Sequence, residues 1–583
     1  MKKNYAFLLT AILCVTEISN AQSPDWLWAR GLGSSQDDRS NSVVVDASGN
    51  VYTTGRFYGT IDFDPGPGTF YLTASGGPAS FVYKLDSAGN FIWAKAFTGT
   101  GLGMGNALVV SGSNGDIYST GYYSGTVDFD PGPGIFNMGT MSSVLNIYVS
   151  RLDSSGNFVW AKAMGGNDHA IGQSIGLDAL GNVYTGGDFW STIDFDPGPG
   201  VYNLTALPVA TLPDGYISKL DTSGNFLWAI SFRGTSENAV QSLTVDPAGS
   251  VYSTGYFVGT VDFDPGAGTY NLLSSFGGGS YDCFISKLDS SGHLVWAKKL
   301  DGTWDDYGYS VKIDPSGSGP VYITGSFNDT VDFDPGPGVY KLRTMSGQNS
   351  QSFILKLDSA GNFIWARATE GSGNSNPWSL ALSPVNGDVY ITGGMTDTVD
   401  MDPGTGVFNL VSIGGGDGYI TRLNSSGTFV WAKGLGGTNN DYGRSVTMDA
   451  SGNCFVTGMF SSPTLICGAD TLTGHSSSAF IHDFFIARLD THALLTGIPV
   501  AYLDPELTVF PNPAINDFTV LLSREYPVTH VSITDITGKI IFETEVKSTR
   551  HITVQSINFA AGIYFIQIRQ DGRRQCRKLI VTK

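Results

Sequence analysis

The stretch Val127-Asp-Phe-Asp-Pro-Gly-Pro-Gly134 recurs along the chain at a nearly constant spacing. Both aspartates and both glycines of this motif persist in six copies, although Ala267 replaces a proline in the fourth copy and Met401 and Thr405 vary the sixth. The copies lie at residues 62–68, 128–134, 194–200, 262–268, 332–338 and 400–406. Self-similarity at a fixed period is typical of solenoids, propellers and linear arrays, so we interpret the chain as a repeat protein.

A second motif, Leu-Asp-Ser-Ser-Gly-Asn-Phe-Val-Trp-Ala-Lys at residues 152–162, keeps the same period. Its Trp-Ala pair occurs seven times, at intervals of 65 to 69 residues. The tryptophans are Trp28, Trp93, Trp160, Trp228, Trp296, Trp365 and Trp431. Seven evenly spaced anchors predict seven copies of one supersecondary unit.

Within the first repeat, apolar residues alternate in segments that are joined by Gly-Asn turns. Residues 42–46 and 51–57 are one such pair of segments, and residues 81–86 and 91–95 are another. Alternation on both sides of a turn predicts a β-hairpin, and no segment has the period of a helix. Four strands in each of seven repeats predict an all-β fold, a seven-bladed β-propeller of four-stranded blades. The segment Thr60–Thr73 is then a protruding hairpin between the second and third strands.

The two ends of the array are complementary. It opens at residues 25–30 with a Trp-Ala segment that has no Leu-Asp-x-x-Gly-Asn before it, and it closes at residues 484–490 with the opposite half. We expect Trp26–Gly31 to pair with Phe484–Asp490 and to close a ring, because closure removes two exposed sheet edges. A linear β-solenoid is disfavoured because its repeats are usually shorter, at about 20 to 30 residues.

The first 21 residues have the features of a signal peptide. Lys2 and Lys3 precede the apolar run Tyr5–Val15, which is too short to span a bilayer, and Ser19–Ala21 supplies the small residues of a cleavage site. No other apolar run reaches the length of a transmembrane helix. We therefore expect an exported chain without a transmembrane segment.

Charge divides the chain into two parts. The net charge of −19 argues against nucleic acid and anionic membranes as partners, because both select basic surfaces. Residues 22–504 contain 21 Lys and Arg and 44 Asp and Glu, a net charge of −23. Residues 505–583 contain 10 Lys and Arg and 7 Asp and Glu, a net charge of +3. We predict a signal peptide at 1–21, a propeller at 22–490, a linker at 491–506 and a C-terminal domain at 507–583. Cys454 and Cys467 share one repeat, and whether they pair is left open.

Two family resemblances follow from these motifs. Over residues 26–490, the repeats are similar to the short β-propeller repeats of bacterial surface and secreted proteins. The last domain resembles the type A C-terminal sorting domain of the Bacteroidetes type IX secretion system, through its motifs at residues 509–514, 534–539, 561–564 and 577–583. The residues that carry this second resemblance are Pro511, Asn512, Pro513, Asp535, Gly538, Lys539, Gly562 and Tyr564.

The sorting-domain resemblance implies a small β-sandwich, which we expect to be immunoglobulin-like. It also implies the type IX secretion machinery as a partner, export across the outer membrane, and a domain that is commonly removed at the cell surface. The residue pattern agrees, because about seven short strands alternate with turn residues. These strands are expected at residues 507–510, 518–522, 528–534, 539–545, 551–554, 562–569 and 576–581.

The sequence contains no recognised catalytic or nucleotide-binding motif. The seven histidines are scattered, and the loose group Cys467, His475, His482 and Asp483 is the one that comes near the spacing of a zinc site. Gly99–Gly105 has the glycines of a nucleotide loop without a helical pattern after it, so we interpret it as a blade-joining loop. The Leu-Asp-x-x-Gly turn superficially resembles the sialidase Asp box with longer spacings, and that box is a structural turn.

The two aspartates of each Asp-Phe-Asp-Pro-Gly turn are the candidate metal ligands. Because they lie two residues apart on a strand, both carboxylates face one side and the phenylalanine faces the other. They favour either a type II turn stabilised by Asp64 or a calcium site completed by backbone or water oxygens. The candidate ligands are Asp62, Asp64, Asp128, Asp130, Asp194, Asp196, Asp262, Asp264, Asp332, Asp334, Asp400 and Asp402. Residues 461–467 lack the motif, so a blade can be built without it.

Three functions remain open at this point. The leading hypothesis is a non-enzymatic secreted or cell-surface protein whose propeller is a binding or adhesion scaffold for a glycan or a protein. The others are a carbohydrate-active hydrolase or lyase that uses the propeller funnel, and a structural surface-layer protein. Catalysis needs side chains with different acid and base roles, so differences between blades at the ring centre would favour an enzyme, whereas equivalent blades would favour binding or structure.

Overall fold

The computed structural model describes residues 24–140, 144–207, 212–275, 279–314, 317, 319–345, 349–476, 478–491, 507–510, 514, 517–526, 529–535, 539–555, 559–570 and 573–582. Each named element in these ranges is a β-strand, and none of them contains a helix that is long and apolar enough to cross a membrane. The predicted signal peptide and nearly all of the predicted linker lie outside the described residues. The chain divides into two compact units, Met1–Thr491 and His492–Lys583.

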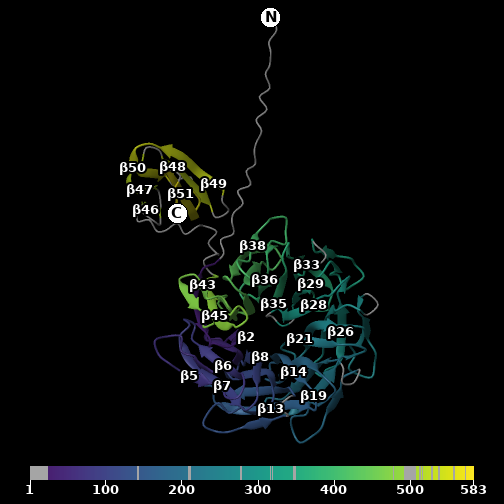
Figure 1. Cartoon of the computed structure of the whole chain (residues 1–583). Helices are drawn as coiled ribbons and strands as arrows, with labels where there is room; N and C mark the ends of the chain where they lie inside the picture. The colour runs from purple at the N-terminus through teal and green to yellow at the C-terminus, as the bar shows by residue number, and fades with distance from the viewer. Residues whose placement is uncertain are drawn as a thin grey trace. The chain divides into compact units, whose positions relative to one another are not determined.

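The first unit contains seven sets of four antiparallel strands among its described residues. Neighbouring inner strands contact one another all the way round, from β2 through β8, β14, β21, β28 and β35 to β41 and back to β2. Figure 1 shows the labelled inner strands around the centre of this ring, which is the arrangement of a β-propeller. From the inner to the outer strand, the sheets are β2 (Arg39–Val45), β3 (Val51–Phe57), β6 (Ala79–Leu85), β7 (Phe91–Gly99); β8 (Gly103–Val110), β9 (Ile117–Tyr123), β12 (Asn146–Leu152), β13 (Phe158–Gly166); β14 (Ala170–Leu177), β15 (Val183–Phe189), β18 (Asp214–Leu220), β19 (Phe226–Ser231); β21 (Asn238–Val245), β22 (Val251–Phe257), β25 (Asp282–Leu288), β26 (Leu294–Lys299); β28 (Tyr307–Ile313), β29 (Val321–Phe327), β32 (Gln351–Leu357), β33 (Phe363–Ala368); β35 (Ser375–Leu382), β36 (Val389–Met395), β39 (Asp417–Leu423), β40 (Phe429–Leu435); and β41 (Asp441–Met448), β42 (Cys454–Phe460), β45 (Asp483–Leu489), β1 (Trp26–Leu32).

The first strand closes the ring, as the split repeat predicts. Strand β1 is antiparallel to β45 and is the outer strand of the last sheet. Its buried face carries Trp28 and Leu32, which join the apolar core of the first sheet. The two sheet edges that an open array would expose are therefore paired with each other.

The tryptophans and the Leu-Asp-x-x-Gly-Asn turns pack against each other between neighbouring sheets. Gly89 has a φ of 79°, and a Cβ atom there would lie 2.8 Å from the ring of Trp28. The Trp28 indole also donates to the Ser87 carbonyl oxygen over 3.1 Å. The same glycine-on-tryptophan contact recurs at Gly156, Gly224, Gly292, Gly361 and Gly427. The second repeat motif thus fastens each sheet to the next.

Short hairpins lie between the second and third strands of each repeat, as predicted. They are not simply protruding, because five of them pair with the end of the outer strand of the preceding sheet or with a two-residue strand just after it. The hairpins are β4 (Thr60–Asp62) with β5 (Tyr71–Thr73), β10 (Thr126–Asp128) with β11 (Asn137–Gly139), β16 (Thr192–Asp194) with β17 (Asn203–Thr205), β23 (Thr260–Asp262) with β24 (Asn271–Leu273), β30 (Thr330–Asp332) with β31 (Lys341–Arg343), β37 (Thr398–Asp400) with β38 (Asn409–Val411), and β43 (Thr464–Cys467) with β44 (Asp470–Thr473). The two-residue strands are β20 (Arg233–Gly234), β27 (Asp301–Gly302) and β34 (Glu370–Gly371).

The second unit is built from two antiparallel sheets. One has the order β46-β47-β50 and the other the order β49-β48-β51-β52. Phe518 and Val520 of the first sheet pack with Val531, Ile533 and Ile566 of the second in one apolar core. All seven strands that the sequence predicts are present: β46 (Leu507–Phe510), β47 (Asp517–Tyr526), β48 (Thr529–Asp535), β49 (Ile540–Val546), β50 (Thr549–Gln555), β51 (Gly562–Gln570) and β52 (Arg573–Val581).

Candidate ligand-binding channel

The inner strands of the first unit surround a channel of about 380 Å³. In each of the seven inner strands the pairing with the second strand shifts by one residue, which is a β-bulge. A bulge inserts one extra residue and redirects its side chain. The seven extra residues all line the channel: Asn41, Asn106, Gln173, Gln241, Tyr309, Trp378 and Arg444.

The residue after each bulge connects the inner strands around the channel. It is serine in six sheets, and its hydroxyl accepts a hydrogen bond from a backbone N–H of the next inner strand. The bond from Val43 N–H to Ser445 Oγ, at 3.2 Å, joins the last sheet to the first. Ala107 is the exception and has no hydroxyl to offer its neighbour. This layer is therefore structural, whereas the layer of bulge residues is free to vary.

One half of the bulge layer is amide-rich. The Asn41 side-chain amide donates to the Gly105 carbonyl oxygen, and that of Asn106 donates to the Gly172 carbonyl oxygen, each over 2.9 Å. The Gln173 amide lies 3.4 Å from Asp188, a buried carboxyl whose pKa burial raises to about 7. Each of these amides keeps a further donor or acceptor for a ligand.

The other half of the bulge layer is aromatic and cationic. The guanidinium carbon of Arg444 lies 4.8 Å from the ring centroid of Trp378, which is in edge contact with Tyr442 at 5.3 Å. Tyr309 lies parallel to Tyr307, with ring centroids 6.0 Å apart. Flat aromatic surfaces beside polar groups are typical of small-molecule sites.

A group of tyrosines extends this aromatic half beyond the bulge layer. Tyr307 contacts both Tyr256 and Tyr281, with ring centroids 5.5 Å and 5.2 Å apart. The Tyr281 hydroxyl donates to the carboxylate of Glu237, and this hydrogen bond, together with burial, raises the pKa of Tyr281 to about 12. These rings come from elements at the starting end of the inner strands, so we name this end the channel mouth.

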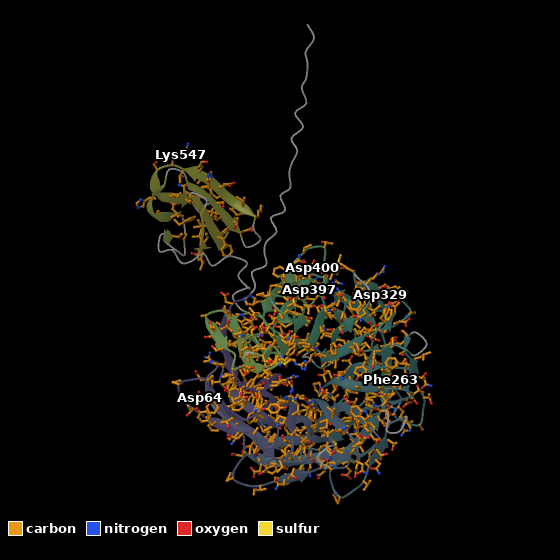
Figure 2. The ribbon with its side chains drawn as sticks, viewed as in Figure 1. Asp64, Phe263, Asp329, Asp397, Asp400 and Lys547 are labelled. Carbon is orange, nitrogen blue, oxygen red and sulfur yellow. The ribbon has the colours of Figure 1, made fainter. Side chains whose placement is uncertain are left out.

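The predicted aspartate pairs lie elsewhere, in the hairpins between neighbouring sheets, and Figure 2 shows Asp64 at the outer edge of the ring. Asp62 Oδ1 accepts the backbone N–H groups of Asp64 and Phe70, and Asp64 Oδ1 accepts that of Gly66 over 2.8 Å. The same three bonds recur in all six copies. Phe63 is fully buried, as expected of an anchor.

The type II turn predicted at Pro65-Gly66 is wrong. That turn needs a positive φ at the glycine, and Gly66 and its five described counterparts do not have one. Instead, the Asp64 carboxylate captures the Gly66 N–H and forms an Asx-turn. A Cβ atom at Gly68 would lie 2.2 Å from Asp64 Oδ2, so the second glycine is needed for space. Calcium binding at these aspartates stays a prediction.

The loose group around Cys467 is not brought together as one site. His475 Nδ1 lies 2.8 Å from Asp483, whereas His482 Nδ1 lies 2.8 Å from Asp37. Among the described residues, no three His, Cys, Asp or Glu side chains gather as metal ligands. Cys454 and Cys467 are both buried as free thiols.

Half of the sorting-motif residues fall within the described part of the second unit. Lys539 N–H donates to Asp535 Oδ1 over 3.1 Å and closes the turn between β48 and β49. Tyr564 is buried, and its hydroxyl donates to the Ala560 carbonyl oxygen over 2.9 Å. Gly562 begins β51. Pro511, Asn512, Pro513 and Gly538 lie outside the described residues.

The comparisons with known proteins agree with this architecture. Residues 508–582 match the family model described as secretion system C-terminal sorting domain. An uncharacterised WD repeat-containing protein of Acanthamoeba polyphaga mimivirus is 23% identical over 446 residues, which are 64% of this chain and 31% of that protein. An endo-acting ulvan lyase of Formosa agariphila is 36% identical over 86 residues, 14% of this chain and 16% of that protein. The chain thus spans less than a third of the length of these curated relatives.

Among solved structures, Sqt1 from Chaetomium thermophilum has a TM-score of 0.35 and 10% identity, and the alignment covers 80% of this chain and 99% of that one. The sheets and the WD-repeat relative define an all-β repeat protein of the propeller type. The sorting-domain match indicates secretion through the type IX system to the cell surface or the extracellular space.

Proposed function

We propose that this protein is a secreted or cell-surface binding protein, without enzymatic activity, whose propeller holds a carbohydrate ligand at the channel mouth. In this proposal the seven four-stranded sheets are the blades of one closed propeller. The C-terminal unit is an immunoglobulin-like sandwich that engages the type IX secretion machinery.

The observation that carries the proposal is where the repeats differ. The second strand of every sheet keeps a buried aromatic residue at one position, tyrosine in six sheets and Phe455 in the seventh. The bulge layer, by contrast, holds five residue types in seven positions. Tyr309 and Trp378 offer apolar surfaces for the faces of sugar rings, and the amides offer partners for hydroxyl groups. Such variation argues against a purely structural ring, and because none of the seven varying residues is a carboxyl, it does not supply the acid and base that catalysis needs.

The alternative, a carbohydrate-active hydrolase or lyase, rests on two carboxyl groups near the channel mouth, Asp188 and Glu237. Hydrolysis of a glycosidic bond usually needs two carboxyl groups, and none of the seven bulge residues is acidic. Burial and the nearby charge of Glu237 raise the pKa of Asp188, as a general acid requires. Release of reducing ends from a polysaccharide, lost in Asp188→Asn, would establish this alternative.

A glycan array probed with the labelled mature chain tests the binding proposal. We expect binding to one glycan class, and loss of that binding in Trp378→Ala. The matched control is Tyr71→Ala, which removes an aromatic ring that is 64% exposed on the hairpin β4–β5. We call the hairpins from β4–β5 to β37–β38 the rim. Equal binding by wild type and Trp378→Ala, with loss in Tyr71→Ala, would move the site to the rim and overturn the proposal.

A further inference from the structure

Each blade holds a cation that packs against an aromatic ring. On the third strand of each sheet, a lysine or arginine lies over the buried aromatic ring of the second strand, within 4.7 to 5.5 Å of its centroid. At the channel mouth, Arg39 and Arg56 both bind the carboxylate of Asp37. The cations at these positions therefore have an aromatic ring or a carboxylate beside them.

Two cations in the channel have no carboxylate partner. Arg444 and Lys312 are the charged residues that line it, and no aspartate or glutamate lines it among the described residues. Within the described part of the chain, neither side chain has a hydrogen bond or an ion pair to a carboxylate. Arg444 lies over the face of Trp378, as the blade cations lie over their aromatic rings.

The electrostatics of both groups show the cost of this arrangement. Burial lowers the pKa of Arg444 to about 10, and repulsion from Arg39 adds to the shift. Burial alone lowers the pKa of Lys312. A buried charge without a counter-charge is unfavourable, and an incoming anion would relieve that cost.

We infer that the channel accepts an acidic polysaccharide, and that Arg444 and Lys312 bind the carboxylate or sulfate oxygens on its sugars. This inference rests on the proposed carbohydrate-binding function and names the class of its ligand. Arg444 belongs to the bulge layer, whereas Lys312 lies three positions beyond Tyr309 along β28, so the two cations stand at different depths. Such spacing suits a chain that carries repeated anionic groups. The guanidinium stacked on Trp378 can bind an oxyanion in two-point fashion while the indole contacts the sugar ring.

The overall charge of −19 makes this local arrangement informative. An anionic polymer is repelled by most of the surface, so long-range attraction does not explain its binding. The two channel cations must supply the favourable contacts at short range, and these are screened less by salt when partly buried.

Titration of the full mature chain with three oligosaccharides of matched length tests the inference. The probes are oligogalacturonate with carboxylates, dextran sulfate with sulfate esters, and neutral dextran. We expect at least one acidic probe to bind about ten-fold tighter than the neutral one, since hydrogen bonds to charged groups have that magnitude. The stronger of the two acidic probes identifies the anionic group.

Four variants separate a binding role from a structural one. Arg444→Gln and Lys312→Gln should each weaken acidic-probe binding by about ten-fold, and Arg444→Lys should restore part of the loss. Lys341→Gln removes the same charge from an exposed rim position and should change nothing. Because neither wild-type cation has a carboxylate partner, the two glutamine variants should not lower the melting temperature.

The outcomes distinguish this inference from the proposed function beneath it. If all three probes bind equally and Arg444→Gln and Lys312→Gln bind like wild type, the ligand is neutral and only the inference is overturned. If no probe binds and the glutamine variants unfold at lower temperature, the cations are structural and the inference is overturned, while the glycan array decides the carbohydrate-binding proposal separately.

Discussion

Ring closure by β1 can be tested with a pair of neighbouring substitutions. Trp28 is buried, its indole donates to Ser87 in the first sheet, and its ring covers Gly89. Leu27, the preceding residue on the same strand, is 49% exposed. Replacing a buried tryptophan by alanine costs about 3–5 kcal/mol, whereas a surface substitution costs within about 0.5 kcal/mol.

The expected change in melting temperature follows from the size of the unit. With roughly 2.1 cal/mol/K of unfolding entropy per residue, a unit of roughly 470 residues has an entropy of about 1 kcal/mol/K. Trp28→Ala should therefore lower the melting temperature by roughly 3–5 °C, and Leu27→Ala by less than about 1 °C. Calorimetry of both variants beside the wild type is the assay. Equal melting temperatures for the two variants would refute closure through β1.

Four further predictions concern other parts of the chain. Ala107→Ser should complete the layer of serine hydroxyls between the inner strands and raise the free energy of unfolding in urea titration by about 0.5–1.5 kcal/mol. A lower free energy of unfolding would show that the new hydroxyl does not reach a backbone N–H of the next inner strand. The wild-type protein should lose stability as the pH rises from about 4 to about 7, because the Asp188 pKa is raised to about 7 in the folded state, which therefore binds the proton more tightly than the unfolded state. Asp188→Asn should abolish this fall in the free energy of unfolding. Asp128→Ala should destabilise its hairpin by about 1–3 kcal/mol through the loss of two hydrogen bonds. A calcium-dependent rise in melting temperature that Asp128→Asn with Asp130→Asn abolishes would establish the calcium site instead. Removal of Leu507–Lys583 should leave the remaining chain in the periplasm on cell fractionation, and its arrival at the surface would contradict the sorting role.

The strands could be predicted because each carries its own local signal. Alternating apolar residues on both sides of an Asp-x-x-Gly-Asn turn specify a hairpin, and the aspartate fixes the turn by accepting two backbone N–H groups, as Asp86 does from Ala88 and Asn90. The split repeat predicted the pairing of β1 with β45 because each end lacks the half that the other holds. The C-terminal strands were predicted for the same local reason.

The channel could not be predicted from the repeated motifs, because its side chains stand where the repeats disagree. Each bulge residue precedes the serine of the inner ring, or Ala107 in one sheet, and this position is the signal that would have pointed to Trp378 and Arg444. The turn at Pro65-Gly66 was mispredicted because local sequence favours a positive φ at glycine, whereas the Asp64 carboxylate holds the Gly66 N–H in an Asx-turn. The aspartate pairs were predicted as candidate ligands because they repeat, and in the structure they accept backbone N–H groups of their own hairpin.

Hydrogen exchange with and without the bound glycan tests most directly whether the ligand site is the variable channel mouth or the repeated rim. The account predicts slower exchange on ligand binding in β28, β35 and β41, which carry Tyr309, Trp378 and Arg444, and unchanged exchange in the hairpins from β4–β5 to β37–β38. Slower exchange confined to those hairpins, with the inner strands unchanged, would contradict it.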